Sequence, residues 1–225
     1  MLNGLLLVDK PVGISSFDVI RILRRQTGVR KIGHAGTLDP LASGLMLMLF
    51  GTACKQAETL TKFDKRYKAQ ITLGSNSTTG DGEGEKLVVS DRIPEVAEIE
   101  AALTKFTGEI TQTPSMYSAI KINGKEAYKR ARAGETVVMP SRTVQIRELL
   151  MTGYTYPILE IEAQVSSGTY IRSLAEDIGA SLGTGAYLSG LVRTSVDKYR
   201  LDDASRLDDL TAENATSAMI TIGLS

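Results

Sequence analysis

The sequence predicts an α+β protein with a mixed, mostly antiparallel central sheet that is flanked by helices and loops. Residues 5–8 and 45–50 are short apolar runs with the length of buried strands, and residues 158–165 have strand-like character. Helical spacing is confined to separate segments, chiefly residues 95–106 and 170–182. Long strands with helices segregated from them are typical of the α+β class.

The elements of the first half follow from local signals. After the strand at residues 5–8, Ser15 or Ser16 is expected to cap a helix that ends at Gly28. The residues that share one face of this helix are Phe17, Ile20 and Leu23. A helix is expected at residues 52–63. A strand is expected at residues 67–73, and residues 75–85, rich in Gly, Ser, Thr and Asp, are expected to form an exposed loop.

The second half is predicted in the same way. The Asn123-Gly124 pair indicates a tight turn with a short helix after it. Residues 136–144 are predicted to form a strand. Residues 188–195 fit either element, and strand is favoured. No boundary divides the chain before about Arg200, so we expect one domain over residues 1–200 and a short extension over residues 201–225.

Composition narrows the class of protein. The chain has 225 residues, of which 42% are hydrophobic, enough for one sizeable core. No apolar run approaches the roughly 20 residues that span a bilayer, and the first nine residues do not resemble a signal peptide. The single cysteine, Cys54, excludes an internal disulfide. These features favour a soluble cytoplasmic protein with no membrane attachment.

The charges are balanced in number but unevenly distributed. The formal net charge is zero, which argues against a non-specific coat on nucleic acid. Residues 21–38 nevertheless carry five cationic side chains and no acid, and residues 121–132 carry five against one Glu. Two basic patches on a neutral protein suit the binding of one shaped polyanion. The alternative is that both are ordinary solvated helix faces.

Residues 31–45 form the most informative segment, KIGHAGTLDPLASGL. Gly33 and Gly36 allow the backbone to turn sharply beside a ligand. Asp39 precedes Pro40, which disfavours the helical conformation at Asp39 and helps to present its side chain from a loop. An isolated Asp-Pro pair would indicate only a turn.

Together with five further motifs, this segment resembles the signature of the TruB family of tRNA pseudouridine synthases. The motifs, in order, are DKPVGISS at residues 9–16, KRYKA at 65–69, TTGDGEG at 78–84, QTPSMYSA at 112–119 and SSGTYIRSL at 166–174. The resemblance covers residues 4–200, and a Leu-rich stretch at residues 188–193 follows in its place. Ala35 and Ser43 depart from the usual pattern, and the chain is expected to be a short form without a complete C-terminal RNA-binding (PUA) domain.

The resemblance implies the pseudouridine synthase fold, with residues 1–200 as the catalytic domain. It also implies isomerisation of the T-loop uridine at tRNA position 55, by base flipping, cleavage of the C1′–N1 bond and rejoining of C1′ to C5. This reaction changes no oxidation state, so no cofactor is expected, and one His and one Cys are too few for most metal sites of those ligands. The expected partner is the T stem-loop of tRNA, with the protein acting as a monomer that requires no protein partner.

Three catalytic residues are implied by the resemblance: Asp39, Tyr67 and Arg172. A carboxylate can attack an electrophilic carbon, stabilise positive charge at C1′ or remove a ribose proton, and these roles stay open for Asp39. Arg172 is expected to pair with Asp39 and keep it ionised, since an opposite charge nearby lowers a carboxyl pKa by about 1 to 3 units. Tyr67 is expected to stack on the flipped base, the alternative being an ordinary core tyrosine.

Five further residues are implied to contact the substrate. His34 is expected to insert into the RNA loop, where the alternative is a loop histidine bonded to backbone. Lys10 is expected to support the active-site loop, with a surface salt bridge as the alternative. Tyr170 and Leu191 are expected to line the pocket, and Asp81 to touch the RNA or the base.

The same residues are compatible with other functions. A tRNA-folding chaperone role can coexist with catalysis. The catalytic subunit of a guide-RNA particle is a second candidate, but that group usually carries basic tails and a C-terminal domain. A cation or phosphate site at GDGEG, residues 80–84, lacks the ending of a P-loop and the spacing of an EF-hand.

Overall fold

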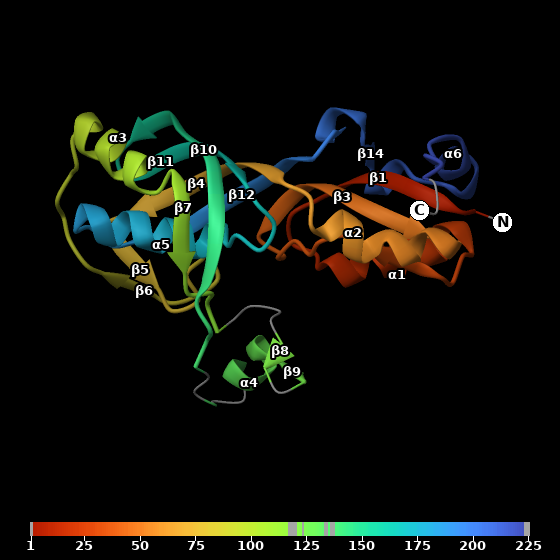
Figure 1. Ribbon diagram of the computed structural model, residues 1–225, viewed down its shortest axis with the longest axis horizontal. Helices are drawn as coiled ribbons and strands as arrows, with labels where there is room; N and C mark the ends of the chain where they lie inside the picture. The colour runs from red at the N-terminus through yellow and green to blue at the C-terminus, as the bar shows by residue number, and fades with distance from the viewer. Residues whose placement is uncertain (1, 117–120, 123, 133–134, 136–137, 223–225) are drawn as a thin grey trace. The chain divides into compact units, whose positions relative to one another are not determined.

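The computed structural model describes residues 2–116, 121–122, 124–132, 135 and 138–222. The chain groups into two compact units, residues 1–68 with 191–225, and residues 69–190. Strands β4 (Lys65–Leu73) and β12 (Ala186–Val196) carry the chain from one unit to the other (Figure 1). This grouping does not test the expected division near residue 200, which stays a prediction.

The first unit is built on a mixed sheet. Its strands are β1 (Gly4–Lys10), β2 (Ile32–His34), β3 (Ala42–Phe50), β13 (Tyr199–Arg200) and β14 (Ser205–Arg206), together with the end of β12. β3 pairs antiparallel with β1 and β2 and parallel with β12, and β14 adds to β1 in parallel. The predicted strands at residues 5–8 and 45–50 are therefore confirmed as the centre of β1 and β3.

Both faces of β1 and β3 are buried, which explains their continuous apolar sequences. One face packs against Ala53 and Leu60 from the segments that follow β3. The strand residues on that face are Leu5, Leu7, Leu45, Leu47 and Leu49. The alternate residues are also buried: Leu6, Val8, Met46, Met48 and Phe50. Figure 1 shows α1 and α2 lying beside these strands.

Helix α1 (Ser16–Thr27) begins and ends where the sequence predicted. Ser15 is the N-cap and forms a capping box with Asp18, and Gly28 ends the helix in the left-handed conformation with φ of 71°. Of the three residues expected to share one face of this helix, Ile20 and Leu23 are buried, whereas the side chain of Phe17 is 59% exposed. The buried face of the helix consists of Ser16, Val19, Ile20 and Leu23.

One segment of the first unit differs from the expected pattern. The helix predicted at residues 52–63 is divided into a 3-10 turn, η1 (Gly51–Gln56), and the short helix α2 (Ala57–Thr61). Beyond residue 200 the chain forms short elements: η2 (Leu201–Asp203), β14, η3 (Leu207–Asp209) and α6 (Ala212–Ser217). These return to the first unit, since Leu5 and Ile220 exchange backbone hydrogen bonds of 2.9 and 2.8 Å.

The second unit contains an antiparallel sheet. β11 (Ile158–Val165) pairs with β10 (Arg142–Thr155), and β10 pairs with β7 (Gly108–Gln112). β4 borders β11 in the strand order. The prediction for residues 158–165 is confirmed, whereas the strand expected at 136–144 starts only at Arg142, and residues 136–137 lie outside the described residues.

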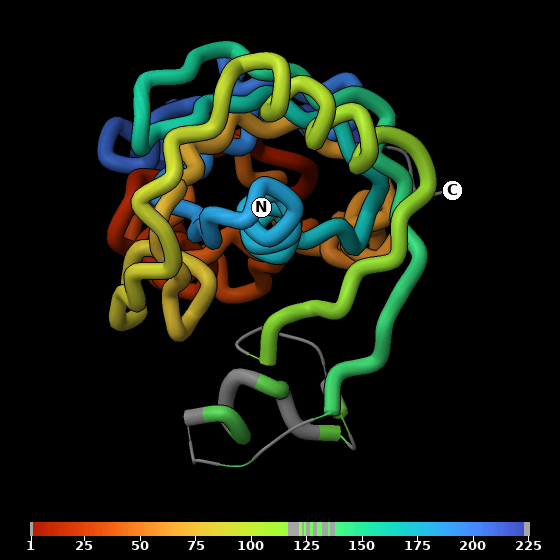
Figure 2. Tube along the Cα trace, turned by 90° about the vertical axis from the view of Figure 1, so that its left-hand side faces the viewer, coloured from red at the N-terminus to blue at the C-terminus, as the bar shows by residue number. Residues whose placement is uncertain are grey.

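Two amphipathic helices pack together in the second unit. α3 (Val96–Lys105) contacts α5 (Ile171–Leu182) and β10. Figure 2 shows α5 end-on in light blue, with α3 in yellow-green. Both agree with the predicted helices to within one residue at each end, and Gly183 ends α5 in the left-handed conformation. The mostly antiparallel α+β prediction is confirmed.

The remaining elements are short. β5 (Ser75–Ser77) pairs with β6 (Lys86–Val88), so the loop expected at residues 75–85 begins as a hairpin, and Ser77 and Asp81 within it are buried. β8 (Lys121–Ile122) pairs with β9 (Lys125–Glu126), and α4 (Ala127–Arg132) follows. The expected Asn123-Gly124 turn includes Asn123, which lies outside the described residues. Across the described ranges, no helix is long and apolar enough to cross a membrane.

Candidate active site

Asp39 is exposed on the loop between β2 and β3, and the backbone of this loop is held at several points. The Ser16 hydroxyl donates to the Leu38 carbonyl and accepts from the Leu38 N–H, both at 2.9 Å. The Asp39 carbonyl accepts from the Ala42 N–H at 3.0 Å, and the Pro40 carbonyl accepts from the Gly13 N–H at 2.8 Å. The structure therefore presents the Asp39 carboxylate from a loop fastened on both sides.

Lys10 lies in the same unit and is fully buried, so the alternative of a surface salt bridge is wrong. Its ammonium donates to the carbonyls of Pro11 and Ile14, both at 2.8 Å. Burial lowers the pKa of Lys10 to about 8; the charge of Asp39 acts in the opposite direction, and Arg193 adds to the lowering. The negative charge of Asp39 thus favours the charged form of the Lys10 ammonium.

Two cations that are not among the predicted site residues lie beneath the loop. Arg193, which is 1% exposed, donates to carbonyls at both ends of the Asp39 loop. Lys65 donates to the carbonyls of Thr61 and Phe63 at 2.7 and 2.5 Å, and burial followed by the charge of Arg193 lowers its pKa to about 8. A cation inside an otherwise buried strand pattern was the available sequence signal for both.

His34 lies at the end of β2, paired with Met48, so the alternative reading of a loop histidine does not hold, and its insertion into the RNA loop stays a prediction. Its Nδ1 is buried and has no hydrogen-bond partner among the described residues. Burial, and then the charge of Arg193, lower the pKa of His34 from its ordinary value and so favour the neutral ring. A neutral, half-buried ring suits contact with bases better than contact with phosphates.

Tyr67 and Leu191 both belong to strands of the first unit. Tyr67 is only 8% exposed, on the buried face of β4. Leu191 is half-buried in β12 opposite Ala42, the residue whose N–H bonds to Asp39. Leu191 is therefore next to the carboxylate loop, and the stacking role of Tyr67 stays a prediction.

Arg172 and Asp81 form a buried ion pair in the second unit. The Arg172 Nε lies 3.3 Å from the Asp81 carboxylate, and its Nη1 donates to the Thr79 carbonyl at 3.2 Å. The Asp81 carboxylate also accepts from the Thr79 hydroxyl at 2.5 Å and from the Glu83 N–H at 3.1 Å. Burial raises the pKa of the neighbouring Glu176. The expected pairing of Arg172 with Asp39, which belongs to the other unit, stays a prediction.

Tyr170 precedes α5 and is held through its backbone. The fully buried Gln112 side chain accepts from the Tyr170 N–H at 3.0 Å and donates to the Tyr170 carbonyl at 3.2 Å. The guanidinium of Arg142 lies 5.4 Å from the centre of the Tyr170 ring. Gln112 sits in one of the quoted motifs, but nothing in its spacing pointed to this contact.

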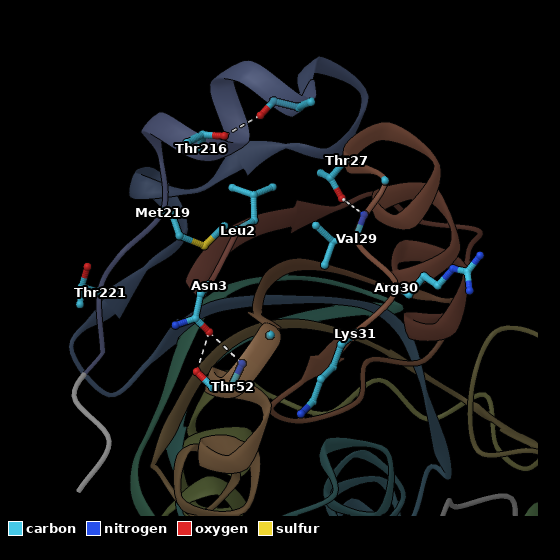
Figure 3. Close-up of a pocket in the computed structure, with 13 residues that line it drawn as sticks. Leu2, Asn3, Thr27, Val29, Arg30, Lys31, Thr52, Thr216, Met219 and Thr221 are labelled. Carbon is cyan, nitrogen blue, oxygen red and sulfur yellow. Dashed lines mark hydrogen bonds between the residues drawn. The ribbon is translucent and has the colours of Figure 1, made fainter.

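The first unit also contains a cavity of about 1080 Å³ between the end of α1 and the C-terminal elements, shown in Figure 3. None of the eight predicted site residues is in its lining. Several of its polar groups bond to the protein itself: Asn3 accepts from the Thr52 N–H and hydroxyl, and Thr216 donates to Ala212. The cavity offers no chemistry to the Asp39 site.

The lowered pKa of Lys10 gives a testable dependence of stability on pH. Between its folded value of about 8 and its ordinary value of 10.5, the unfolded chain binds more protons, so stability rises with pH in this window. We expect the free energy of unfolding of the wild type, measured by urea denaturation, to rise relative to Lys10→Met from pH 8 to 10. An exposed control, Lys105→Met, should show a constant difference, and a constant difference for Lys10→Met would contradict the prediction.

Known proteins resemble this chain over most of its length. Residues 24–171 match the model of the N-terminal domain of TruB family pseudouridylate synthases, and residues 172–219 match that of the tRNA pseudouridylate synthase B C-terminal domain. The tRNA pseudouridine synthase B of Burkholderia pseudomallei (strain 668) is 49% identical over 94% of this chain and 70% of its own. That of Thermobifida fusca (strain YX) is 44% identical over 95% of this chain and 76% of its own.

Among solved structures, a Cbf5-Nop10-Gar1 complex contains a chain that matches with a TM-score of 0.73 and 28% identity, over 92% of this chain. This protein spans 53%, about half, of that chain. The mixed sheet and the carboxylate loop, with these likenesses, define a pseudouridine synthase, an isomerase. The chain belongs to the TruB family of pseudouridylate synthases.

Proposed function

We propose that this chain isomerises the T-loop uridine at position 55 of tRNA to pseudouridine, with Asp39 as the catalytic carboxylate. The observation that carries the proposal is the exposed Asp39 side chain on a loop held by Ser16 and Arg193. A reactive group on a fixed loop can meet a flipped nucleotide without a further loss of conformational freedom. The relatives named tRNA pseudouridine synthase B support tRNA as the substrate.

The reaction is balanced without a redox partner. The C1′–N1 bond breaks, the uracil rotates, and C1′ joins C5; C5 then loses its proton while N1 gains one. Asp39 acts at the nucleotide, and Arg172 keeps it ionised. Extruding the base costs a few kcal/mol, and stacking on an aromatic ring such as Tyr67 returns about 1–3 kcal/mol.

RNA recognition in this proposal uses shape and phosphate contacts. Helix α1 exposes Arg21, Arg24 and Arg25, which suit phosphates of the stem. His34 fills the space that the flipped base leaves. The remaining substrate contacts in the proposal are Lys10 beneath the loop and Tyr170, Leu191 and Asp81 around the base. In the second basic patch, residues 121–132, many side chains lie outside the described residues.

The proposal includes a monomer that modifies bare tRNA in the cytoplasm and needs no protein partner. The competing function is that of a guide-RNA particle, because the matched Cbf5 chain was solved together with Nop10 and Gar1. The higher identity to tRNA pseudouridine synthase B, 49% against 28%, favours the tRNA enzyme.

Mapping of pseudouridine at nucleotide resolution tests this function. An unmodified tRNA transcript is incubated with the purified chain alone, with no guide RNA and no protein partner. We expect pseudouridine at position 55 and at no other uridine. Modification at a different position would contradict the substrate assignment, and modification only after a guide RNA and partners are added would favour the particle.

A further inference from the structure

Arg193 stands out in the first unit as a buried cation without an acid. Its side chain is 1% exposed, and the part of the chain that the structure describes offers it no carboxylate within ion-pairing distance. Removing a guanidinium from water without a counter-ion is costly. The charge also faces Lys10 and Lys65, two further buried cations whose pKa values it helps to lower. Because this arrangement is energetically unfavourable, we expect Arg193 to have a specific role.

All three hydrogen bonds of the guanidinium go to backbone around the Asp39 loop. Nε donates to the Leu45 carbonyl of β3 at 2.7 Å. Nη2 donates to the Gly36 carbonyl at 3.2 Å, and Nη1 to the Thr37 carbonyl at 3.4 Å. One planar group therefore ties the residues before Asp39 to the strand that follows it.

The backbone of Arg193 is held in place as well as its guanidinium. Arg193 lies opposite Gly44 in the parallel pairing of β12 with β3. A Cβ on Gly44 would stand 2.4 Å from the Arg193 carbonyl oxygen, so the absence of a side chain there permits the close approach. Gly36 has φ of 95°, which favours glycine, and a Cβ on it would meet Nη1 at 3.4 Å. Gly44 thus leaves room for the backbone of Arg193, and Gly36 leaves room for its guanidinium.

We propose that Arg193 is a positioning residue for the pseudouridine synthase reaction, holding the Gly36–Thr37 backbone so that Asp39 is presented at one fixed place. The inference rests on the proposed role of Asp39. A lysine at this position keeps the charge, but its single ammonium cannot span the carbonyls of Gly36, Thr37 and Leu45 as the planar fork does. In this variant the Asp39 loop loses the hydrogen bonds that hold it, which we call the brace, while a positive charge stays in the core.

The test compares Arg193→Lys with wild type, using Arg200→Met, an exposed residue of the adjoining β13, as the matched control. We expect Arg193→Lys to melt within about 5 °C of wild type. Its single-turnover rate on tRNA should fall about 10²-fold, as a misplacement of about 1 Å can produce, with the Kd for tRNA unchanged within about twofold. A rate within threefold of wild type would overturn the proposal, as would an equal loss of rate and affinity.

Amide hydrogen exchange gives a second readout that does not depend on activity. Peptides covering residues 36–42 should exchange faster in Arg193→Lys than in wild type or Arg200→Met, while peptides of β1 and α1 are unchanged. Unchanged exchange in residues 36–42 would contradict the proposal that Arg193 holds this backbone, even if the wild type proved inactive on tRNA. Faster exchange with an inactive wild type would sustain the brace and reject only the proposed function.

Discussion

Replacing Asp39 by asparagine should abolish pseudouridine formation and leave tRNA binding intact. The substitution removes the charge and keeps the shape of the side chain. The loop is held by Ser16, Arg193 and backbone bonds, so we expect it to keep its conformation. We expect the single-turnover rate to fall at least about 10³-fold, equal to about 4 kcal/mol of transition-state stabilisation.

The measurement is tritium release from C5 of labelled uridine in a tRNA transcript, with the Kd measured in parallel. Asp202→Asn, an exposed carboxylate of the same unit, is the matched control and should retain full activity. Residual pseudouridine above a few per cent of the wild-type rate in a clean Asp39→Asn preparation would remove Asp39 from the chemistry. A tRNA-folding activity, if the chain has one, should survive in this variant.

Replacing Arg172 by methionine should damage both stability and activity. Asp81 is 4% exposed, so losing the guanidinium leaves a carboxylate buried without its cation. Removing one member of a buried pair typically costs 3–5 kcal/mol, and we expect a loss of about 3 kcal/mol in the free energy of unfolding. Activity should fall about 10²-fold or more, because Arg172 is also expected to keep Asp39 ionised.

A double-mutant cycle separates these two effects. Adding Asp81→Asn to Arg172→Met should recover part of the lost stability, since no buried charge then remains unpaired, whereas activity should stay low. Lys62→Met, which breaks an exposed pair with Glu58, is the control and should change neither quantity measurably. Recovery of activity along with stability in the double variant would show that Arg172 serves the fold alone.

Local signals in the sequence were sufficient for much of the fold. The apolar runs of β1 and β3, the capping serine of α1 and the glycine that ends α1 act within a few residues of the chain. These effects do not depend on distant partners, so periodicity and turn chemistry predict them. The motif around Asp39 likewise identified the loop that the structure presents.

The tertiary structure alone decided which polar groups meet. Arg193 bonds to Gly36 across 157 positions of sequence, and Arg172 bonds to Thr79 across 93. The exposure of Phe17 and the burial of Asp81 likewise depend on what packs against each residue. Periodicity reports which side of an element is apolar, but the partner of a buried charge is set by the folding of segments that are distant in the chain. The sequence therefore determined the elements and the loop that carries Asp39, whereas the folded chain determined how that loop is held.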